Sequence, residues 1–322
     1  MVRATPPVSG LPRLGLGGAA LGGLYTHVDD DEAVAVVVEA VRRGLSYIDT
    51  APLYGHGTSE LRIGRALSKI PRAEVTISTK VGRLIEAASP EHSEHDMFAD
   101  APPTRVVRDY SRSGVLRSIE SSLRRLGTDR VDIVYVHDPE DHMDDAISEA
   151  VPALAELREQ GVVGAIGVGT NLVDVPRRFL AECDIDVVLL AGRWTLLDRT
   201  GESLLDSCGD RGVAVVLGGI MNSGLLADPD NNPTFDYLPA ADRLVVAAKA
   251  MRQECTRAGV SLGAAAVQHA FRHPSVRTVL VGCRNRLEVD FAAGAAGADV
   301  DADLWQLLDI LAEPLQCAEP AS

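Results

Sequence analysis

The chain has 322 residues and a formal net charge of −15, with 46% hydrophobic but only 4% aromatic residues. This charge argues against nucleic-acid binding, because phosphate contacts need a basic surface. The longest apolar run, 213–221, is too short for a membrane span, and the first residues lack the apolar core of a signal peptide. These properties predict a cytoplasmic protein with neither a membrane nor a nucleic acid as partner.

Short apolar strands alternate with amphipathic helices along the chain. The predicted strands are 13–17, 46–48, 75–79, 132–136, 163–168, 186–190, 213–217 and 278–281. The predicted helices are 31–43, 59–68, 113–126, 146–160, 173–182, 202–211, 262–272 and 286–293, with extra helices near 240–257 and 303–311. The strands are continuously apolar, which is expected when both faces of a sheet are buried.

Eight β/α pairs in a chain of this length predict an α/β fold, a (β/α)8 TIM barrel with extra helices and long active-site loops. The long loops are 86–112 and 228–239, and both follow predicted strands. Long loops in compact domains often carry function. No linker interrupts the pattern, so a single barrel domain is expected over residues 1–322.

Four polar residues lie at or just after the ends of predicted strands: Asp49, Tyr54, Lys80 and His137. Barrel enzymes build their active sites at this end of the strands. A nearby ammonium would lower the pKa of a phenol, and an aspartate paired with the lysine would keep it charged and oriented. A histidine can donate a hydrogen bond to a substrate oxygen. Such a set can move a proton while hydride passes to or from a nicotinamide.

The segments around these residues resemble those of the aldo-keto reductase family. They read GLSYIDTAPLYG over 44–55, SELRIGRAL over 59–67, TKVGR over 79–83 and DIVYVHD over 132–138. Together they follow the order and spacing of the family along nearly the whole chain. The resemblance implies that Tyr54 is the general acid/base, that Asp49 and Lys80 tune it, and that His137 orients the substrate.

The resemblance also implies NAD or NADP as cofactor. The glycine-rich segment 15–22 continues as a loop and does not open a helix, which argues against a Rossmann fingerprint. We instead expect Gly17 and Gly18 to let the cofactor approach the backbone of the first strand. Thr170 or Asn171 would replace the family's serine toward the nicotinamide, with a helix N-cap as their competing role.

Other cofactor positions depart from the family pattern. Gly218 stands where the family often stacks a tyrosine under the nicotinamide, and the adenine-side asparagine is replaced by Ala292. Gly282 and Arg284 belong to a segment that resembles the family's adenosine-phosphate site, where a helix N-terminus favours phosphate. Glu288 aligns with a position that is often basic in NADP-using members. A carboxylate there would repel a 2′-phosphate, which favours NAD slightly.

The substrate pocket is predicted to include Tyr25 and Trp194, with Trp194 equally well explained as a core side chain. No metal site is expected, because the histidines 92, 95 and 142 lack the spacing of zinc ligands. The acidic segment 138–145 does not have the spacing of a calcium loop and is interpreted as a solvated turn.

Several segments resemble the aldose dehydrogenase branch of the family: 14–25, 109–111, 136–142 and 222–226. This implies oxidation of an aldose hemiacetal, L-fucose-like or D-threo-aldose, to its lactone, with Tyr54 taking the hydroxyl proton. The alternatives are an NADPH-dependent carbonyl reductase, a pyridoxal dehydrogenase and, in another class, a cofactor-binding regulatory subunit without turnover. The expected partner is a small-molecule sugar or carbonyl compound, and the sequence does not predict an oligomeric state.

Overall fold

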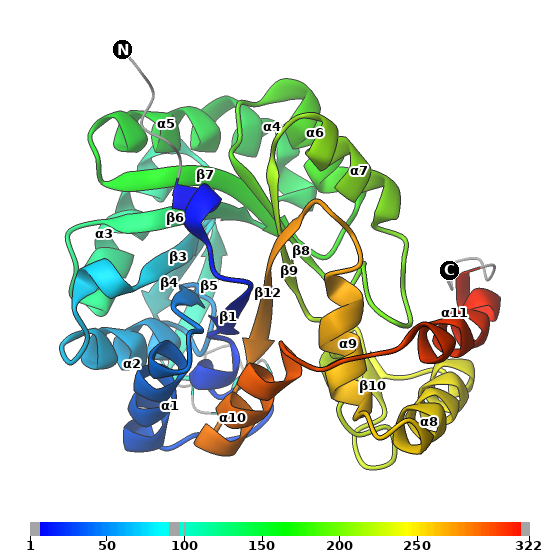
Figure 1. The fold of residues 1–322 in the computed structure, drawn as a ribbon. Coiled ribbons are helices and arrows are strands. Elements are labelled where there is room, and N and C mark those ends of the chain that lie inside the picture. Colours follow the sequence, from blue (N-terminus) through cyan, green and yellow to red (C-terminus); the bar gives the residue numbers. More distant parts are fainter. Residues whose placement is uncertain (1–6, 90–96, 100, 317–322) are drawn as a thin grey trace.

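The computed structural model describes residues 7–89, 97–99 and 101–316. Eight parallel strands close into a barrel in the order β1-β12-β9-β8-β7-β6-β3-β2 (Figure 1). Their bounds are β1 Leu14–Gly17, β2 Tyr47–Asp49, β3 Thr76–Val81, β6 Val131–His137, β7 Val163–Thr170, β8 Val187–Ala191, β9 Ala214–Gly218 and β12 Val276–Gly282. The predicted TIM barrel is confirmed.

Helices surround the barrel and connect successive strands (Figure 1). They are α1 Asp30–Arg42, α2 Thr58–Leu67, α3 Arg112–Leu126, α5 Val151–Glu159, α6 Asp174–Glu182, α7 Glu202–Asp210, α9 Leu262–Ala270 and α10 Arg286–Ala295. The short α4 (Met143–Asp145) and a π-helical turn (Ala146–Ala150) precede α5, so the helix predicted at 146–160 is not α-helical at its start. The extra helices α8 (Asp242–Arg257) and α11 (Ala302–Gln316) lie side by side outside the ring. No helix in these described ranges is long and apolar enough to cross a membrane.

Strand residues alternate between two buried environments. Side chains such as Ile48, Val134 and Ile166 belong to the large cluster that packs under the helices. Their neighbours, including Tyr47 and Ile133, belong to a separate cluster inside the barrel. Because successive strand residues point to opposite faces, this double burial explains why the strands read as continuous apolar runs.

The two predicted long loops each contain a hairpin. β4 (Arg83–Ala87) and β5 (Thr104–Arg108) pair antiparallel at the ends of the first, and β10 (Thr234–Phe235) and β11 (Leu238–Pro239) pair within the second. The prediction missed these strands because they lie outside the barrel and are mostly half-exposed or exposed, so they lack its apolar signature. His92 and His95 lie outside the described residues.

Two glycines bring the loop after β1 against the turn after β2. Gly55 has a φ of 60°, and a Cβ there would lie 2.3 Å from the Gly22 carbonyl oxygen. A Cβ on Gly22 would in turn lie 2.7 Å from the Gly55 nitrogen. Only two glycines allow this backbone contact, which fixes the turn immediately after Tyr54.

Gly55→Ala should therefore destabilise the protein more than Gly127→Ala. Gly127 has a similar φ of 65° but open space around its Cβ position. Alanine at either position incurs roughly 1–2 kcal/mol of left-handed backbone strain, and Gly55→Ala adds about 1–3 kcal/mol of overpacking. The free energy of unfolding from denaturant titration measures both. Equal losses in the two variants would show that the contact with Gly22 does not constrain the turn.

Candidate active site

Three neighbouring barrel strands bring the predicted polar residues together. The strands β2, β3 and β6 are consecutive in the barrel, with Asp49 paired in register with Ser78 and Lys80 with Tyr135. Asp49 ends β2, Lys80 lies next to the end of β3, and His137 ends β6. Their side chains consequently meet at the C-terminal end of the barrel, beside the turn that carries Tyr54.

Lys80 and Asp49 form a buried ion pair at this position. The Lys80 Nζ lies 2.6 Å from Asp49 Oδ2 and donates a second hydrogen bond of 2.9 Å to the Thr50 carbonyl. The two side chains are only 1% and 4% exposed. The ammonium lies 4.6 Å from the centre of the Tyr54 ring, which is a cation–π distance. The ring of Tyr54 meets that of His137 edge-on, at a centroid separation of 6.0 Å.

A chain of hydroxyl groups supports Asp49 from inside the barrel. Ser78 donates to Asp49 Oδ1 at 2.7 Å, and its oxygen lies 2.9 Å from the Tyr47 hydroxyl. Tyr47 in turn lies 2.9 Å from the hydroxyl of Tyr135. All four residues are buried. Both carboxylate oxygens of Asp49 are thus engaged, which fixes the orientation of the group that holds Lys80. The sequence analysis did not identify this network.

The electrostatic environment of Tyr54 differs from the one predicted. Burial raises the pKa of Tyr54 well above its usual value, and the carboxylates of Asp49 and Asp138 raise it further. Arg83 is a cation that lowers the pKa of Tyr54 and that was not predicted. Lys80 is paired with Asp49 at 2.6 Å, and its predicted tuning of Tyr54 stays a prediction.

His137 is a neutral imidazole at pH 7. Burial, with Lys80 and Arg83 nearby, holds the pKa of His137 well below its usual range. Its Nε2 lies 3.4 Å from Asp138 Oδ2, and within the described residues its buried Nδ1 has no hydrogen-bond partner. The Tyr110 hydroxyl lies 2.6 Å from the His137 carbonyl oxygen, to which it donates. A neutral imidazole fixed in this way can donate a hydrogen bond to a substrate oxygen without carrying a charge.

Asp138 is part of the site and not of a solvated turn. Its backbone φ of 43° is left-handed, and its carboxylate accepts a 2.9 Å hydrogen bond from Arg83. The side chain is 24% exposed, and burial raises the pKa of Asp138. The prediction of a solvated acidic turn over 138–145 is therefore wrong for its first residue. Neither Asp138 nor Arg83 was singled out from the sequence as a site residue.

Three aromatic side chains surround the position of Tyr54. The Phe98 ring lies 6.2 Å from that of Tyr54, and Phe98 is bridged to Leu24 beside Tyr25. Tyr25, predicted for the pocket, is 45% exposed, and Tyr237 is 47% exposed. Burial raises the pKa of Tyr237, and the charges of the Tyr54 and Tyr25 phenols raise it further. Tyr237 was missed by the sequence analysis because it lies in a segment without a family motif.

Trp194 does not line this pocket. It is 7% exposed and packs against His269 of α9 at 5.2 Å and against His273 at 5.5 Å between ring centroids. These neighbours belong to α9 and the turn that leads into the start of β12, away from the end of the strands where Tyr54 lies. The alternative interpretation, a core side chain, is the one that the structure supports.

The predicted cofactor glycines have different surroundings. Gly17 and Gly282 are paired across β1 and β12, and a Cβ on Gly17 would come no closer than 3.6 Å to any neighbour. A Cβ on Gly218 would have similar room, because its nearest neighbour, the Leu189 side chain, would lie 3.6 Å away. Gly18 differs, because a Cβ there would lie 2.6 Å from the Asp49 carbonyl oxygen. Its lack of a side chain is thus required by packing against β2, and its contact with the cofactor stays a prediction.

The end of β7 presents one unengaged amide. Thr170 is buried and its hydroxyl accepts the N–H of Leu172 at 3.1 Å, whereas the Asn171 side chain has no hydrogen-bond partner in the described chain. Neither residue caps α6, whose N-cap is Val173. A second amide, Asn222 after β9, is 2% exposed, and both of its side-chain polar atoms lack a partner among the described residues.

Arg284 and Glu288 form an ion pair at the start of α10. Arg284 donates to Glu288 from its backbone N–H at 2.8 Å and from its guanidinium at 2.8 Å. Asn285 caps the helix by accepting the Glu288 N–H at 3.0 Å. In the structure the two charges form a partly exposed ion pair, and the slight preference for NAD stays a prediction.

Comparison with known proteins places the chain in a family. Residues 13–313 match the family model described as the aldo/keto reductase family. The chain therefore belongs to the aldo-keto reductase family, and it is an NAD(P)-dependent oxidoreductase.

Its relatives fall in the aldose dehydrogenase branch. The chain is 38% identical over 304 residues to D-threo-aldose 1-dehydrogenase of a Pseudomonas species, covering 92% of each. It is 37% identical to pyridoxal 4-dehydrogenase of Microbacterium luteolum, covering 84% of this chain and 85% of that one. L-galactose dehydrogenase of Arabidopsis thaliana is 31% identical, with 86% and 82% covered. Among solved structures, an aldo-keto reductase of Bacillus halodurans in its holo form superposes with a TM-score of 0.74 at 26% identity, covering 93% of this chain and 91% of that one.

Replacing Arg83 should shift the pH dependence of alcohol oxidation. A cation favours the phenolate, so Arg83→Gln should raise the pKa of Tyr54 further and move the rise of the oxidation rate to higher pH. Arg105→Gln is the matched control, because Arg105 pairs with Glu86 on the same hairpin and is exposed. The measurement is kcat/KM for oxidation across the alkaline range. An unshifted profile in Arg83→Gln, or the same shift in the control, would contradict the role of Arg83.

Proposed function

We propose that the protein oxidises the ring hemiacetal of an aldose to a lactone with NAD(P)+, and that Tyr54 is the general base. The observation that carries this proposal is the convergence of Tyr54 with the buried Lys80–Asp49 pair and neutral His137 at one end of the barrel. The similarity to D-threo-aldose 1-dehydrogenase over 92% of the chain supports an aldose as the substrate class.

The proposed step moves one proton and one hydride. His137 donates a hydrogen bond to an oxygen of the bound sugar and orients its C1 hydroxyl toward Tyr54. Tyr54, as phenolate, takes the hydroxyl proton while the C1–H bond breaks and the C1=O bond of the lactone forms. A bound NAD(P)+ would supply the acceptor for the hydride, and its positively charged ring would favour the phenolate. Because burial raises the pKa of Tyr54, oxidation should be favoured by alkaline pH.

Several described residues fit a dinucleotide. Asn171 and Asn222 offer unengaged amides after the ends of β7 and β9, and such amides could form hydrogen bonds with an uncharged carboxamide or a ribose. Gly17 and Gly282 leave the backbone of β1 and β12 accessible on the same side of the barrel. We assign the nicotinamide end to Asn171 and Gly218, and the phosphate end to the segment from Gly282 to Arg284.

Two other functions remain as alternatives. The same four residues would catalyse the reverse reaction, reduction of an aldehyde or ketone, and the aromatic surroundings of Tyr54 would also accept the flat ring of pyridoxal. The similarity to pyridoxal 4-dehydrogenase favours the latter as second candidate. A regulatory subunit without turnover is disfavoured, because all four residues expected for proton transfer are present and lie together at one end of the barrel.

Tyr54→Phe should distinguish an enzyme from a protein that only binds the cofactor. It removes only the hydroxyl, so cofactor binding, measured by fluorescence titration, should stay nearly unchanged. Turnover of an aldose such as L-fucose should fall roughly 10²–10⁴-fold, the usual contribution of an acid/base group. Retention of wild-type turnover would overturn the role of Tyr54.

The substrate class is tested with the wild-type protein. A panel of aldoses, pyridoxal and simple aldehydes, each with both cofactors, should give the highest kcat/KM for an aldose. Higher values for pyridoxal or for aldehyde reduction would replace the proposed substrate, and tight cofactor binding without turnover would favour the regulatory class.

Cofactor preference should respond to the Arg284–Glu288 pair. Glu288→Gln keeps an acceptor for the Arg284 N–H but removes the charge that neutralises its guanidinium. A released cation beside a 2′-phosphate should raise the kcat/KM ratio of NADP+ to NAD+ by up to roughly fivefold, corresponding to about 1 kcal/mol for an exposed pair. Asp290→Asn on the same helix, where Asp290 pairs with Arg43, is the control. An unchanged ratio would show that the ribose 2′-position of the bound cofactor does not lie beside the Arg284–Glu288 pair.

A further inference from the structure

The tip of the β10–β11 hairpin has an unusual backbone. Phe235 pairs with Leu238, so Asp236 and Tyr237 form a two-residue turn, and their φ angles are 48° and 66°. Positive φ at both central residues is the pattern of a type I′ turn, which favours asparagine or glycine. A tyrosine in this conformation is strained, and such strain persists only where the surroundings impose it.

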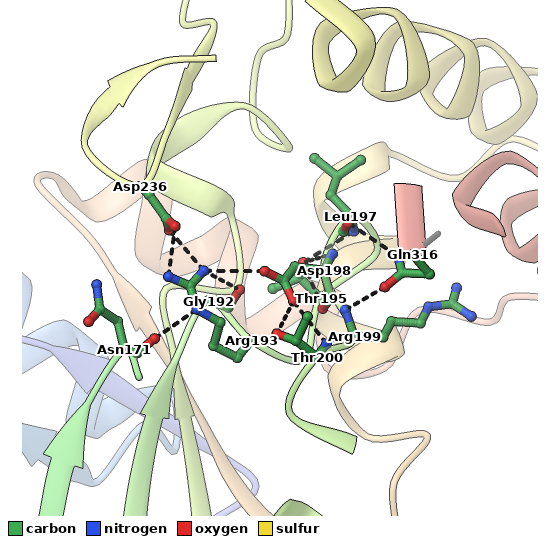
Figure 2. Close-up of polar contacts among 10 residues, drawn as sticks. All are labelled: Asn171, Gly192, Arg193, Thr195, Leu197, Asp198, Arg199, Thr200, Asp236 and Gln316. Atoms are coloured by element: carbon green, nitrogen blue, oxygen red, sulfur yellow. Dashed lines mark hydrogen bonds and ion pairs between the residues drawn. The ribbon is translucent and has the colours of Figure 1, made fainter. Parts of the chain in front are cut away.

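Arg193 imposes the position of this turn (Figure 2). Its guanidinium binds both carboxylate oxygens of Asp236, at 2.7 and 3.1 Å, which is the bidentate geometry of strong charge-assisted pairs. The same group lies 3.2 Å from Asp198 and donates a 2.7 Å hydrogen bond to the Asn171 carbonyl. The Arg193 side chain is 14% exposed. It thus ties together the segments that follow β7, β8 and β9.

Asp198 gives this anchor a rigid base (Figure 2). The Thr195 hydroxyl accepts the N–H of Asp198 at 3.0 Å, and Asp198 Oδ1 accepts from the backbone and side chain of Thr200. These bonds leave the second carboxylate oxygen of Asp198 directed at Arg193. Arg193 is therefore held from the barrel side, and Asp236 is the partner from the hairpin.

The anchored turn holds Tyr237 against the segments that follow β8 and β9, at the end of the barrel where Tyr54 lies. The Tyr237 N–H donates to Ser223 Oγ at 3.0 Å, and the same hydroxyl forms a hydrogen bond with the side chain of Tyr25. Tyr25 and Tyr237 thus converge on Ser223 from the loops after β1 and β9. The Phe98 ring also lies at this end of the barrel, 6.2 Å from that of Tyr54.

We propose that Tyr237 is a specificity-determining residue that contacts the substrate above Tyr54, and that Arg193 is the positioning residue that holds it there through Asp236. This inference rests on the proposed function, because it assumes that a small hydroxyl or carbonyl compound binds at Tyr54. A tyrosine supplies a flat apolar face for the C–H face of a sugar ring and a hydroxyl for one of its oxygens. Arg193 also holds the Asn171 carbonyl, so one side chain fixes both the substrate wall and the segment assigned to the nicotinamide.

The first experiment measures hydrogen exchange of the 234–238 amides in the full-length protein. Asp236→Asn removes the charge that pairs with Arg193, and exchange in the hairpin should become about fivefold faster or more. Asp230→Asn is the matched control, because Asp230 lies in the same loop and pairs with Arg252 and Lys249 instead. The control should leave exchange at 234–238 unchanged. Unchanged exchange in Asp236→Asn overturns the positioning role of Arg193, whether or not the protein is active.

The second experiment tests contact with the substrate by a double-mutant cycle. Tyr237→Ala and Asp236→Asn should each raise KM for the best substrate about tenfold, with a smaller change in kcat and with cofactor affinity of Tyr237→Ala retained. If Arg193 and Asp236 act through Tyr237, the double variant should be no worse than Tyr237→Ala alone. Additive effects would show that the ion pair acts by another route, and an unchanged KM in Tyr237→Ala would overturn the contact.

The two proposals fail in distinguishable ways. A wild-type protein that turns over neither aldoses nor aldehydes removes the proposed function, while the exchange experiment still decides whether Arg193 holds the hairpin. A wild-type protein that prefers an aldehyde or pyridoxal changes only the substrate used in the double-mutant cycle.

Discussion

The buried ion pair between Lys80 and Asp49 is the interaction on which the site depends. Removing two charges from water is costly, and their attraction compensates only when the geometry is good and the remaining hydrogen-bonding groups are satisfied. Here Ser78 and the Thr50 carbonyl satisfy them, and the hydroxyls of Tyr47 and Tyr135 extend the support into the barrel. The register of β2 on β3 therefore serves the pair as well as the fold, because a slip by one residue would separate Asp49 from Ser78.

A second, less buried ion pair, between Arg83 and Asp138, adds to the charge around Tyr54 and His137. Arg83 lies close enough to lower the pKa of both Tyr54 and His137, while Asp138 raises that of Tyr54. Arg83 and Asp138 bind each other at 2.9 Å, so their opposing influences are linked. Lys80 lies 4.6 Å from the centre of the Tyr54 ring and also lowers the pKa of His137, so both ion pairs act on these two side chains. The hairpin that carries Arg83 thus contributes to the charge around Tyr54.

The sequence allowed prediction of the barrel and of the four central residues, because both depend on local signals. Apolar runs mark the strands, and Asp49, Lys80 and His137 follow directly from where those runs end. Contacts between distant segments had no such signal. The pairing of Arg193 with Asp236 joins two loops, and the neutralisation of Glu288 by Arg284 depends on side-chain conformation at a helix start. Trp194 was ambiguous for the same reason, since an aromatic residue after a strand can turn toward the pocket or toward a helix.

Residues on the barrel strands and residues on the loops differ in how freely they can change when such a site adapts to another substrate. Asp49, Lys80 and His137 belong to barrel strands, where burial and register leave little freedom. Tyr25, Phe98 and Tyr237 come from three separate loops and remain partly exposed or lie in short, isolated pairings. A substitution in those loops alters the space above Tyr54 without disturbing the ion pair beneath it. Because the hairpin tip is strained and held by one guanidinium, its position depends on a few interactions at the end of β8, and the substrate wall can change while the proton-transfer machinery stays the same.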